Sequence, residues 1–268
     1  MKGIALHSIV PMRAEARESA EQTTQMLFGE TCRIVEQAER WTLIRLDSDG
    51  QEGWVDAKMI SPMKTEEYDA YRAAYVSAAT VVYPMAYAVS ENNGQTIPLT
   101  AGTRLTNYQE GRFELLGVGF RIDPSMVITQ PRELSLQNLL ETVRFFLNIP
   151  YLWGGKNAMG MDCSGFTQVI MSLFGRQLLR NASEQATQGI AVASLKEAQA
   201  GDLVFFSHQP ESKISHVGIV ADTERVIHCS GRVKVEKLDE TGIFSVEQAD
   251  KAHPNGRYTH YLVSIRRI

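Results

Sequence analysis

Turn residues divide the first 130 residues into short, closely spaced β runs, and this pattern narrows the possible folds more than any other feature. Asp49-Gly50 stands between the alternating apolar runs WTLIRLD and QEGWVDAKMI, and Asn93-Gly94 marks another turn. An Asp-Gly pair between such runs is a strong hairpin signal, because the pair accepts the backbone angles of a tight turn. Strands this short and closely spaced predict small barrels or sandwiches.

The chain is long enough for two or three domains, and its pattern of turn residues and apolar residues changes along the sequence. We expect one small β domain over residues 1–62 and a second over residues 63–130, which begins with a short helix in KTEEYDAYRAAY. From residue 131 a stripe of apolar residues at helical spacing runs through SLQNLLETVRFFLNIPY. Helices and strands are therefore expected to mix in residues 131–268.

Composition excludes several classes of protein. Hydrophobic residues make up 44% and charged residues 22% of the chain, as in ordinary globular proteins. The net charge is -4 and no Lys/Arg cluster is interleaved with aromatic residues, so we expect no nucleic-acid partner. Three cysteines are too few for a disulfide scaffold.

The first residues, MKGIALHSIVPMRAEARESAEQ, bear on localisation. They contain too few consecutive apolar residues for a signal-peptide core or a membrane span. We therefore expect a cytoplasmic protein with no membrane partner, and we separately expect a monomer. A cleaved leader would leave the same text and stays open as the alternative.

The segment GMDCSGFTQVIMSLFG places Cys163 directly before a run of apolar residues at helical spacing that Gly175 closes. A thiol at a helix N-terminus faces backbone N–H groups and the positive end of the helix dipole. We expect these to lower the thiol pKa and to form an anion site for a tetrahedral intermediate. The alternative is a small buried thiol, which is how most free cysteines behave.

Two β runs downstream, HVGIV and VIHCS, flank a turn and predict a hairpin that follows a buried strand in GDLVFFS. If Val220 pairs with Glu224, His216 lies directly opposite His228 on the same face, with Cβ atoms roughly 5 Å apart. Cys229 then points to the other face and fills the core. The alternative is that each histidine is an ordinary packed or surface residue.

These residue types predict a cysteine nucleophile mechanism that needs no cofactor. His216 accepts the thiol proton of Cys163, or holds a thiolate–imidazolium pair with it, and His228 fixes the tautomer of His216. An acyl-enzyme then forms at Cys163. Zinc bound by the same three residues is the rival hypothesis, but neither CxxC nor HExxH spacing is present.

Five ordered segments, YLWGG, DCSGF, GDLVFF, HVGIV and VIHCS, resemble the NlpC-type cysteine peptidases over about residues 135–268. MLFGE, DGQEGW and AGTRL are similar to the paired bacterial SH3-like domains that precede such catalytic units. The resemblance implies a papain-like α+β catalytic domain behind two small all-β SH3-like barrels. The dipeptidyl-peptidase VI type within this family implies cleavage of the γ-D-glutamyl-L-diamino acid bond in murein peptides with a free N-terminal L-alanine, in cell-wall peptide recycling or turnover.

The resemblance also implies roles for individual residues. Cys163, His216 and His228 match the catalytic triad. Tyr151 and Trp153 match an aromatic wall, from which the Tyr151 hydroxyl could reach the oxyanion.

Further matches concern the substrate amine. Asp162 and Ser164 flank the nucleophile at substrate-contact positions, and Asp162 could bind the ammonium group of L-alanine or simply cap the helix. Asn181 stands where these enzymes usually carry Asp, and Gln51 where Tyr is common. Asn keeps hydrogen bonding but loses a negative charge, which weakens amine selectivity or changes the preferred N-terminal residue. An amidase or acyltransferase of related Cys-His chemistry and a non-catalytic wall-binding protein are the alternatives.

Overall fold

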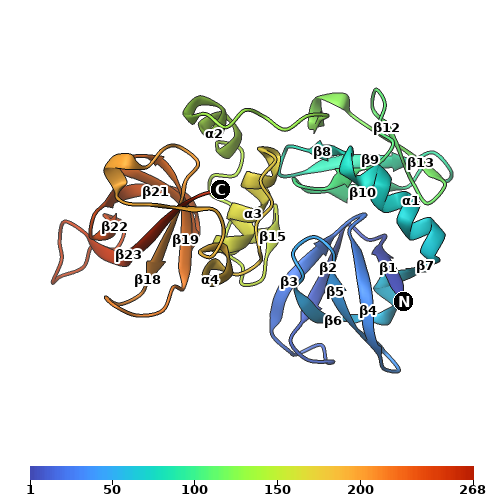
Figure 1. Cartoon of the computed structure of the whole chain (residues 1–268), viewed down its shortest axis with the longest axis horizontal. Helices are drawn as coiled ribbons and strands as arrows, with labels where there is room; N and C mark the ends of the chain where they lie inside the picture. The colour runs from blue at the N-terminus through green and yellow to red at the C-terminus, as the bar shows by residue number, and fades with distance from the viewer. The chain divides into compact units, whose positions relative to one another are not determined.

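The computed structural model describes all 268 residues and consists of two compact units (Figure 1). Unit 1 holds Met1–Pro131 together with Trp153–Ala158, and unit 2 holds Arg132–Leu152 and Met159–Ile268. The segment Trp153–Ala158 thus belongs to unit 1, although its chain neighbours on both sides belong to unit 2. No helix of the structure combines the length and the apolar character needed to cross a membrane.

The first part of unit 1 is a seven-stranded antiparallel sheet with the strand order β3-β2-β6-β5-β4-β1-β7. The predicted Asp49-Gly50 hairpin is confirmed between β5 and β6, and Gly50 has a φ of 77°. Side chains on one face alternate into a core that includes Met12, Met26 and Cys32. The elements are β1 (Lys2–Ala5), β2 (Ile9–Arg13), β3 (Gln22–Leu27), β4 (Thr31–Gln37), β5 (Trp41–Leu46), β6 (Glu52–Asp56), η1 (Ala57–Met59) and β7 (Ile60–Met63).

The second part of unit 1 begins with the predicted helix, α1, and continues as two small sheets with the orders β10-β9-β13-β12 and β11-β8-β14. Whether this part is a second SH3-like barrel stays a prediction. Its elements are α1 (Thr65–Val76), β8 (Ala79–Val81), β9 (Ala86–Ser90), β10 (Thr96–Leu99), β11 (Arg104–Leu105), β12 (Arg112–Leu115), β13 (Val118–Ile122), η2 (Pro124–Met126) and β14 (Val127–Ile128), and the separate segment of unit 1 carries β15 (Lys156–Asn157).

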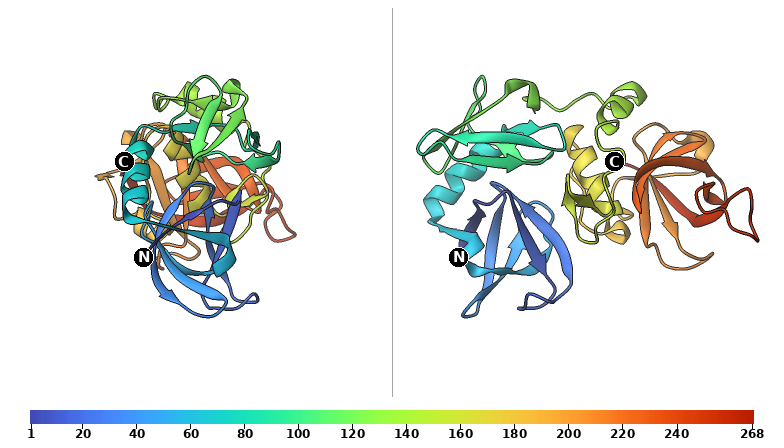
Figure 2. Two further views of the ribbon diagram at one scale, coloured as in Figure 1. Left: turned by 90° about the vertical axis from the view of Figure 1, so that its right-hand side faces the viewer. Right: turned by 180° about the vertical axis from the view of Figure 1, so that it is seen from behind.

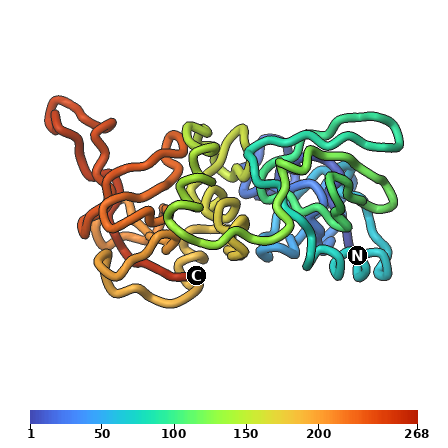
Figure 3. Tube along the Cα trace, turned by 90° about the horizontal axis from the view of Figure 1, so that it is seen from above, coloured from blue at the N-terminus to red at the C-terminus, as the bar shows by residue number.

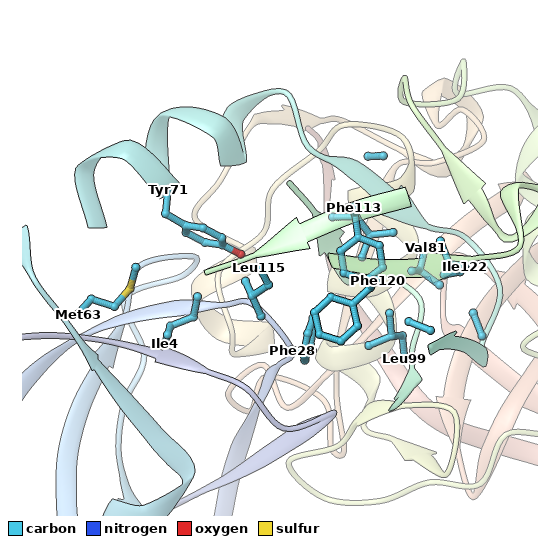
Figure 4. Close-up of a cluster of buried hydrophobic side chains, with 14 of the residues drawn as sticks. Ile4, Phe28, Met63, Tyr71, Val81, Leu99, Phe113, Leu115, Phe120 and Ile122 are labelled. Carbon is cyan, nitrogen blue, oxygen red and sulfur yellow. The ribbon is translucent and has the colours of Figure 1, made fainter. Parts of the chain in front are cut away.

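One apolar cluster joins the two parts of unit 1 (Figure 4). Phe28, which follows β3, packs edge-on against Phe113 and Phe120 with ring centroids 6.4 and 5.8 Å away. The last two rings stack on each other at 5.1 Å. From α1, the Tyr71 hydroxyl donates to the Gly29 carbonyl at 2.8 Å. The first part therefore has a core of its own and shares this second core with the other part.

Unit 2 contains a closed six-stranded antiparallel barrel, because β23 pairs with β18 on one side and with β22 on the other. The predicted mixture of helices and strands is confirmed, although α2 ends at Val143 and is shorter than its apolar stripe. The elements are α2 (Leu136–Val143), β16 (Gly160–Met161), α3 (Cys163–Leu173), α4 (Ala182–Gln185), β17 (Ile190–Val192), η3 (Leu195–Glu197), β18 (Leu203–Ser207), β19 (His216–Asp222), β20 (Arg225–Ser230), β21 (Arg232–Asp239), β22 (Gly242–Ser245) and β23 (Arg257–Arg267).

The barrel has an apolar interior at one end and a covering helix outside. Buried residues such as Val204, Val220 and Ile265 fill that end. Helix α3 packs against the outer side of β19 and β20 (Figure 2). The loop between β22 and β23 extends away from the barrel (Figure 3).

The predicted pairing within the β19–β20 hairpin is wrong by two residues. Val220 pairs with Val226, not with Glu224, and Gly218 stands opposite His228. The turn is tighter than expected because the Asp222 carboxylate accepts from the Glu224 amide at 3.0 Å and the strands bulge after Val220. A shift of two residues leaves every side chain on its predicted face, because strand side chains alternate with a period of two.

We predict that Phe28→Ala lowers the free energy of unfolding by about 3–5 kcal/mol, because it empties the center of an aromatic cluster. Since the two parts of unit 1 share this core, both should lose stability together. Urea unfolding followed by near-UV circular dichroism and by hydrogen exchange of β5 and of β13 would test this. Loss of protection in the first sheet alone would contradict it.

Candidate active site

Cys163 is the first residue of α3, as the sequence predicts, and Asp162 caps the helix. The Asp162 carboxylate accepts from the Gly165 amide at 2.7 Å, which satisfies one of the free N–H groups at the helix start. The Cys163 thiol is buried, with 7% of the residue exposed. It lies against the backbone amide of Val217, the residue that follows His216.

The expected lowering of the thiol pKa is wrong for this buried state. Burial, and next the Asp162 charge, raise the pKa of the Cys163 thiol to about 12, and the amides of Val217 and Ser164 only partly oppose this rise. The thiol is therefore protonated at neutral pH. A proton acceptor must remove the proton when the sulfur attacks.

His216 and His228 lie inside the barrel and meet directly. Nε2 of His216 is 2.8 Å from Nδ1 of His228, and the rings are nearly perpendicular. Gly218 stands opposite His228, and a Cβ at Gly218 would come within 2.5 Å of Val226 Cγ2 and 3.1 Å of the His228 Cβ. The glycine of the HVGIV segment thus avoids crowding Val226 and His228.

A third histidine, His260 of β23, stacks on His216 with ring centroids 4.2 Å apart. No motif in the sequence singles out His260. Burial, followed by the neighboring histidines His260 and His228, lowers the pKa of His216 well below its usual value. Burial also lowers the pKa of His228. Both rings are therefore neutral at neutral pH and able to accept a proton.

Two charged residues of β21, neither of which a sequence motif singles out, complete this buried group. His228 Nε2 is 2.9 Å from Oε2 of Glu236, and the Lys234 ammonium lies 3.1 Å from the same carboxylate. Lys234 also pairs with Glu247 at 3.2 Å. The turn at Ser230-Gly231 could have revealed them, because it sets Lys234 opposite His228 and puts Glu236 on the same face.

Asp162 and Ser164 form a buried cluster with Arg180, a residue that no sequence motif singles out. Arg180 donates to both Asp162 oxygens, at 3.1 and 2.5 Å, and to the Ser164 hydroxyl at 2.8 Å. Only 1% of Arg180 is exposed. The Asp162 charge is thus already balanced, and a substrate amine would have to share it.

The remaining predicted site residues lie in both units. Tyr151 precedes the nucleophile in unit 2, and burial and the Cys163 charge raise the pKa of its phenol, which stays a hydrogen-bond donor. Asn181 caps α4 and donates through Nδ2 to Glu184 at 2.9 Å. Trp153 and Gln51 belong to unit 1, where the Trp153 indole donates to Glu21 at 2.6 Å. Substrate contact by these four residues stays a prediction.

The residues of the rival zinc hypothesis do not form a metal site. No three His, Cys, Asp or Glu side chains come together in a way that could hold a metal ion. The hydrogen-bonded order of His216, His228 and Glu236 instead suits proton transfer.

Comparison with known proteins identifies two domains. Residues 148–248 match the NlpC/P60 family, and residues 12–60 match the bacterial dipeptidyl-peptidase SH3 domain. The predicted NlpC-type domain and one SH3-like domain are therefore confirmed.

Relatives and solved structures agree with this result. A gamma-D-glutamyl-L-lysine dipeptidyl-peptidase of Bacillus subtilis is 29% identical over 218 residues, which cover 76% of this chain and 71% of that protein. A Bacillus cereus protein of the same name is 26% identical over 223 residues, or 76% of this chain and 66% of the relative. An NlpC/P60 family protein from Bacillus cereus, at 19% identity, shares the fold over 100% of this chain and 99% of its own with a TM-score of 0.81.

We predict that alkylation of Cys163 by iodoacetamide speeds up by about tenfold per pH unit between pH 7 and 10, because only the thiolate reacts. Because the pKa of the Cys163 thiol is about 12, the thiolate fraction rises with pH over this whole range. Mass spectrometry of the peptide that contains Cys163 would follow the rate. A plateau below pH 8 would instead reveal a thiolate–imidazolium pair.

We further predict that Arg180→Met lowers the free energy of unfolding by about 3–5 kcal/mol, because it leaves the buried Asp162 carboxylate without its cation. Adding Asp162→Asn should restore part of that loss. Arg17→Met, which breaks the exposed pair with Glu15, is the control and should have no measurable effect. Equal stability of the Arg180 and Arg17 variants in urea would contradict the argument.

Proposed function

Because this chain is a cysteine peptidase of the NlpC/P60 family, we propose that it hydrolyses the γ-D-glutamyl-L-diamino acid bond of murein peptides with a free N-terminal L-alanine. Two observations support the catalytic assignment: the 2.8 Å contact between His216 and His228, and the position of Cys163 at a helix start, with its thiol against the backbone amide of Val217, the residue after His216. The names of the two dipeptidyl-peptidase relatives support the choice of bond. Such an activity serves cell-wall peptide recycling or turnover.

In the proposed reaction Cys163 is the nucleophile and His216 the general base. As the sulfur attacks the γ-carbonyl carbon of D-glutamate, His216 takes the thiol proton. Backbone N–H groups at the start of α3 and the Tyr151 hydroxyl stabilise the tetrahedral oxyanion. His216 then gives the proton to the departing amine of the diamino acid, and water hydrolyses the acyl-enzyme at Cys163.

Low pKa values of the two histidines and the high pKa of the thiol favour a neutral resting pair. Of the two routes open from the sequence, general-base transfer is therefore the one we propose. The imidazolium of His216 exists only while the oxyanion of the tetrahedral intermediate balances its charge.

Recognition of the substrate amine involves the helix caps of unit 2. The Arg180 guanidinium already balances the negative charge of Asp162. Because Asn181 adds no charge, Asp162 by itself would bind an ammonium group only weakly. The Glu184 carboxylate, which Asn181 contacts, keeps a negative charge at this position. We therefore propose a preference for free amines that is weaker than a fully charged pocket would provide.

The proposal predicts that L-Ala-γ-D-Glu-L-Lys yields L-Ala-D-Glu and L-lysine, and that N-acetylation of the peptide slows the reaction. Cys163→Ala should lower kcat by at least about 10³-fold, as loss of a nucleophile does in other triads. Cys32→Ala, another buried free cysteine changed in the same way, is the matched control and should stay active.

Mass spectrometry of the products decides between the hypotheses. Cleavage at another bond would favour an amidase or acyltransferase, and equal rates on both peptides would refute the amine preference. Full activity of the Cys163→Ala protein would end the assignment of the nucleophile.

A further inference from the structure

Glu236 ends a continuous line of buried side chains that begins at His216. The line runs from His216 Nε2 to His228 Nδ1 at 2.8 Å, and from His228 Nε2 to Glu236 Oε2 at 2.9 Å. None of His228 is exposed, and only 8% of the Glu236 side chain is. Both ring nitrogens of His228 therefore have protein partners, and no water molecule is needed to complete their hydrogen bonds.

We propose that Glu236 is a positioning residue for the reaction, which acts by holding His228 and, through it, His216 in the tautomers that catalysis needs. This inference rests on the roles given to the two histidines in the proposed function. Glu236 touches neither the thiol nor the peptide, so it is not itself a catalytic residue.

The tautomers follow from the hydrogen-bonding capacity of each group. A carboxylate can only accept, so the ring nitrogen that faces Glu236, Nε2 of His228, must carry a proton. In a neutral ring the other nitrogen, Nδ1, then has a lone pair and accepts from Nε2 of His216. His216 is consequently protonated on Nε2, which leaves its Nδ1 unprotonated and available as the base.

The opposite order of tautomers would disable the base. If Nδ1 of His228 carried the proton, its Nε2 lone pair would face the carboxylate, and His216 would have to accept at Nε2. The proton of His216 would then lie on Nδ1, the nitrogen that should receive the thiol proton. A neutral group at position 236 that can both donate and accept would allow this exchange.

Glu236 remains ionised throughout the useful pH range. Burial alone would raise its pKa, but contacts with His228, Ser245 and Lys234 outweigh burial and lower the pKa to about 2. The charged or titratable groups that face it are His228, His260 and Lys234, and Lys234 is shared with Glu247. The negative charge of Glu236 also lowers the free-energy cost of forming the His216 imidazolium in a buried site.

Nitrogen NMR of protein labelled at the histidine rings tests the inference directly and needs no substrate. In the wild-type protein at pH 7.5 we expect both His216 and His228 to carry their proton on Nε2, with assignments made from His216→Gln and His228→Asn. A proton on Nδ1 of His228 would overturn the proposal. If the peptide is not cleaved at all, the proposed function fails while this measurement still decides the role of Glu236.

Glu236→Gln is the diagnostic variant, because an amide can accept from or donate to His228. We expect mixed tautomers of both histidines and a fall in kcat of about 10–100-fold with KM unchanged. Glu247→Gln is the matched control, since it removes the same charge from Lys234 without touching His228, and it should leave tautomers and kcat as in the wild type. Wild-type tautomers and kcat in the Glu236→Gln protein would show that the residue serves only its pair with Lys234.

Discussion

The contact between His216 and His228 depends on closure of the barrel in unit 2. β23 closes the barrel by pairing with both β18 and β22, and it brings His260 onto the face of His216. Inside this closed sheet the rings are shielded from water, which strengthens each hydrogen bond and makes any unpaired polar atom costly. An open sheet would leave the same residues solvated and free to rotate.

Burial of so many polar groups requires that each charge has a partner. Glu236 lies between His228 and Lys234, and Asp162 accepts two hydrogen bonds from Arg180. Breaking one member of such a pair is more damaging than replacing both, because the survivor stays buried and charged. Rigidity of the helix start and of the histidine pair therefore has a common electrostatic origin.

Unit 1 depends on apolar packing and not on paired buried charges: a shared apolar core joins its two β parts. Phe28 connects them, and Tyr71 adds a hydrogen bond from α1. The same unit holds Trp153–Ala158 through polar contacts: Gln25 Oε1 accepts from the Lys156 amide at 2.8 Å and from the Asn157 side chain at 2.7 Å. The segment Trp153–Ala158 is thus packed with the N-terminal β parts.

The sequence by itself determined the local structure of the site. Helical spacing placed Cys163 at the start of α3, and alternation put His216 and His228 on one face of a hairpin, both of which depend only on neighboring residues. The register error of two residues left this face unchanged, since only an odd shift would have moved the histidines to the other side.

Tertiary structure alone decided the partners and the protonation of these groups. Arg180 lies 18 residues from Asp162, Glu236 lies 8 from His228 and His260 lies 44 from His216, and only chain packing and barrel closure bring them together. Burial likewise reversed the expected pKa shift of the thiol, because the loss of water outweighs the helix amides. Local patterns fix which way a side chain points, whereas solvation and long-range pairing depend on the whole fold.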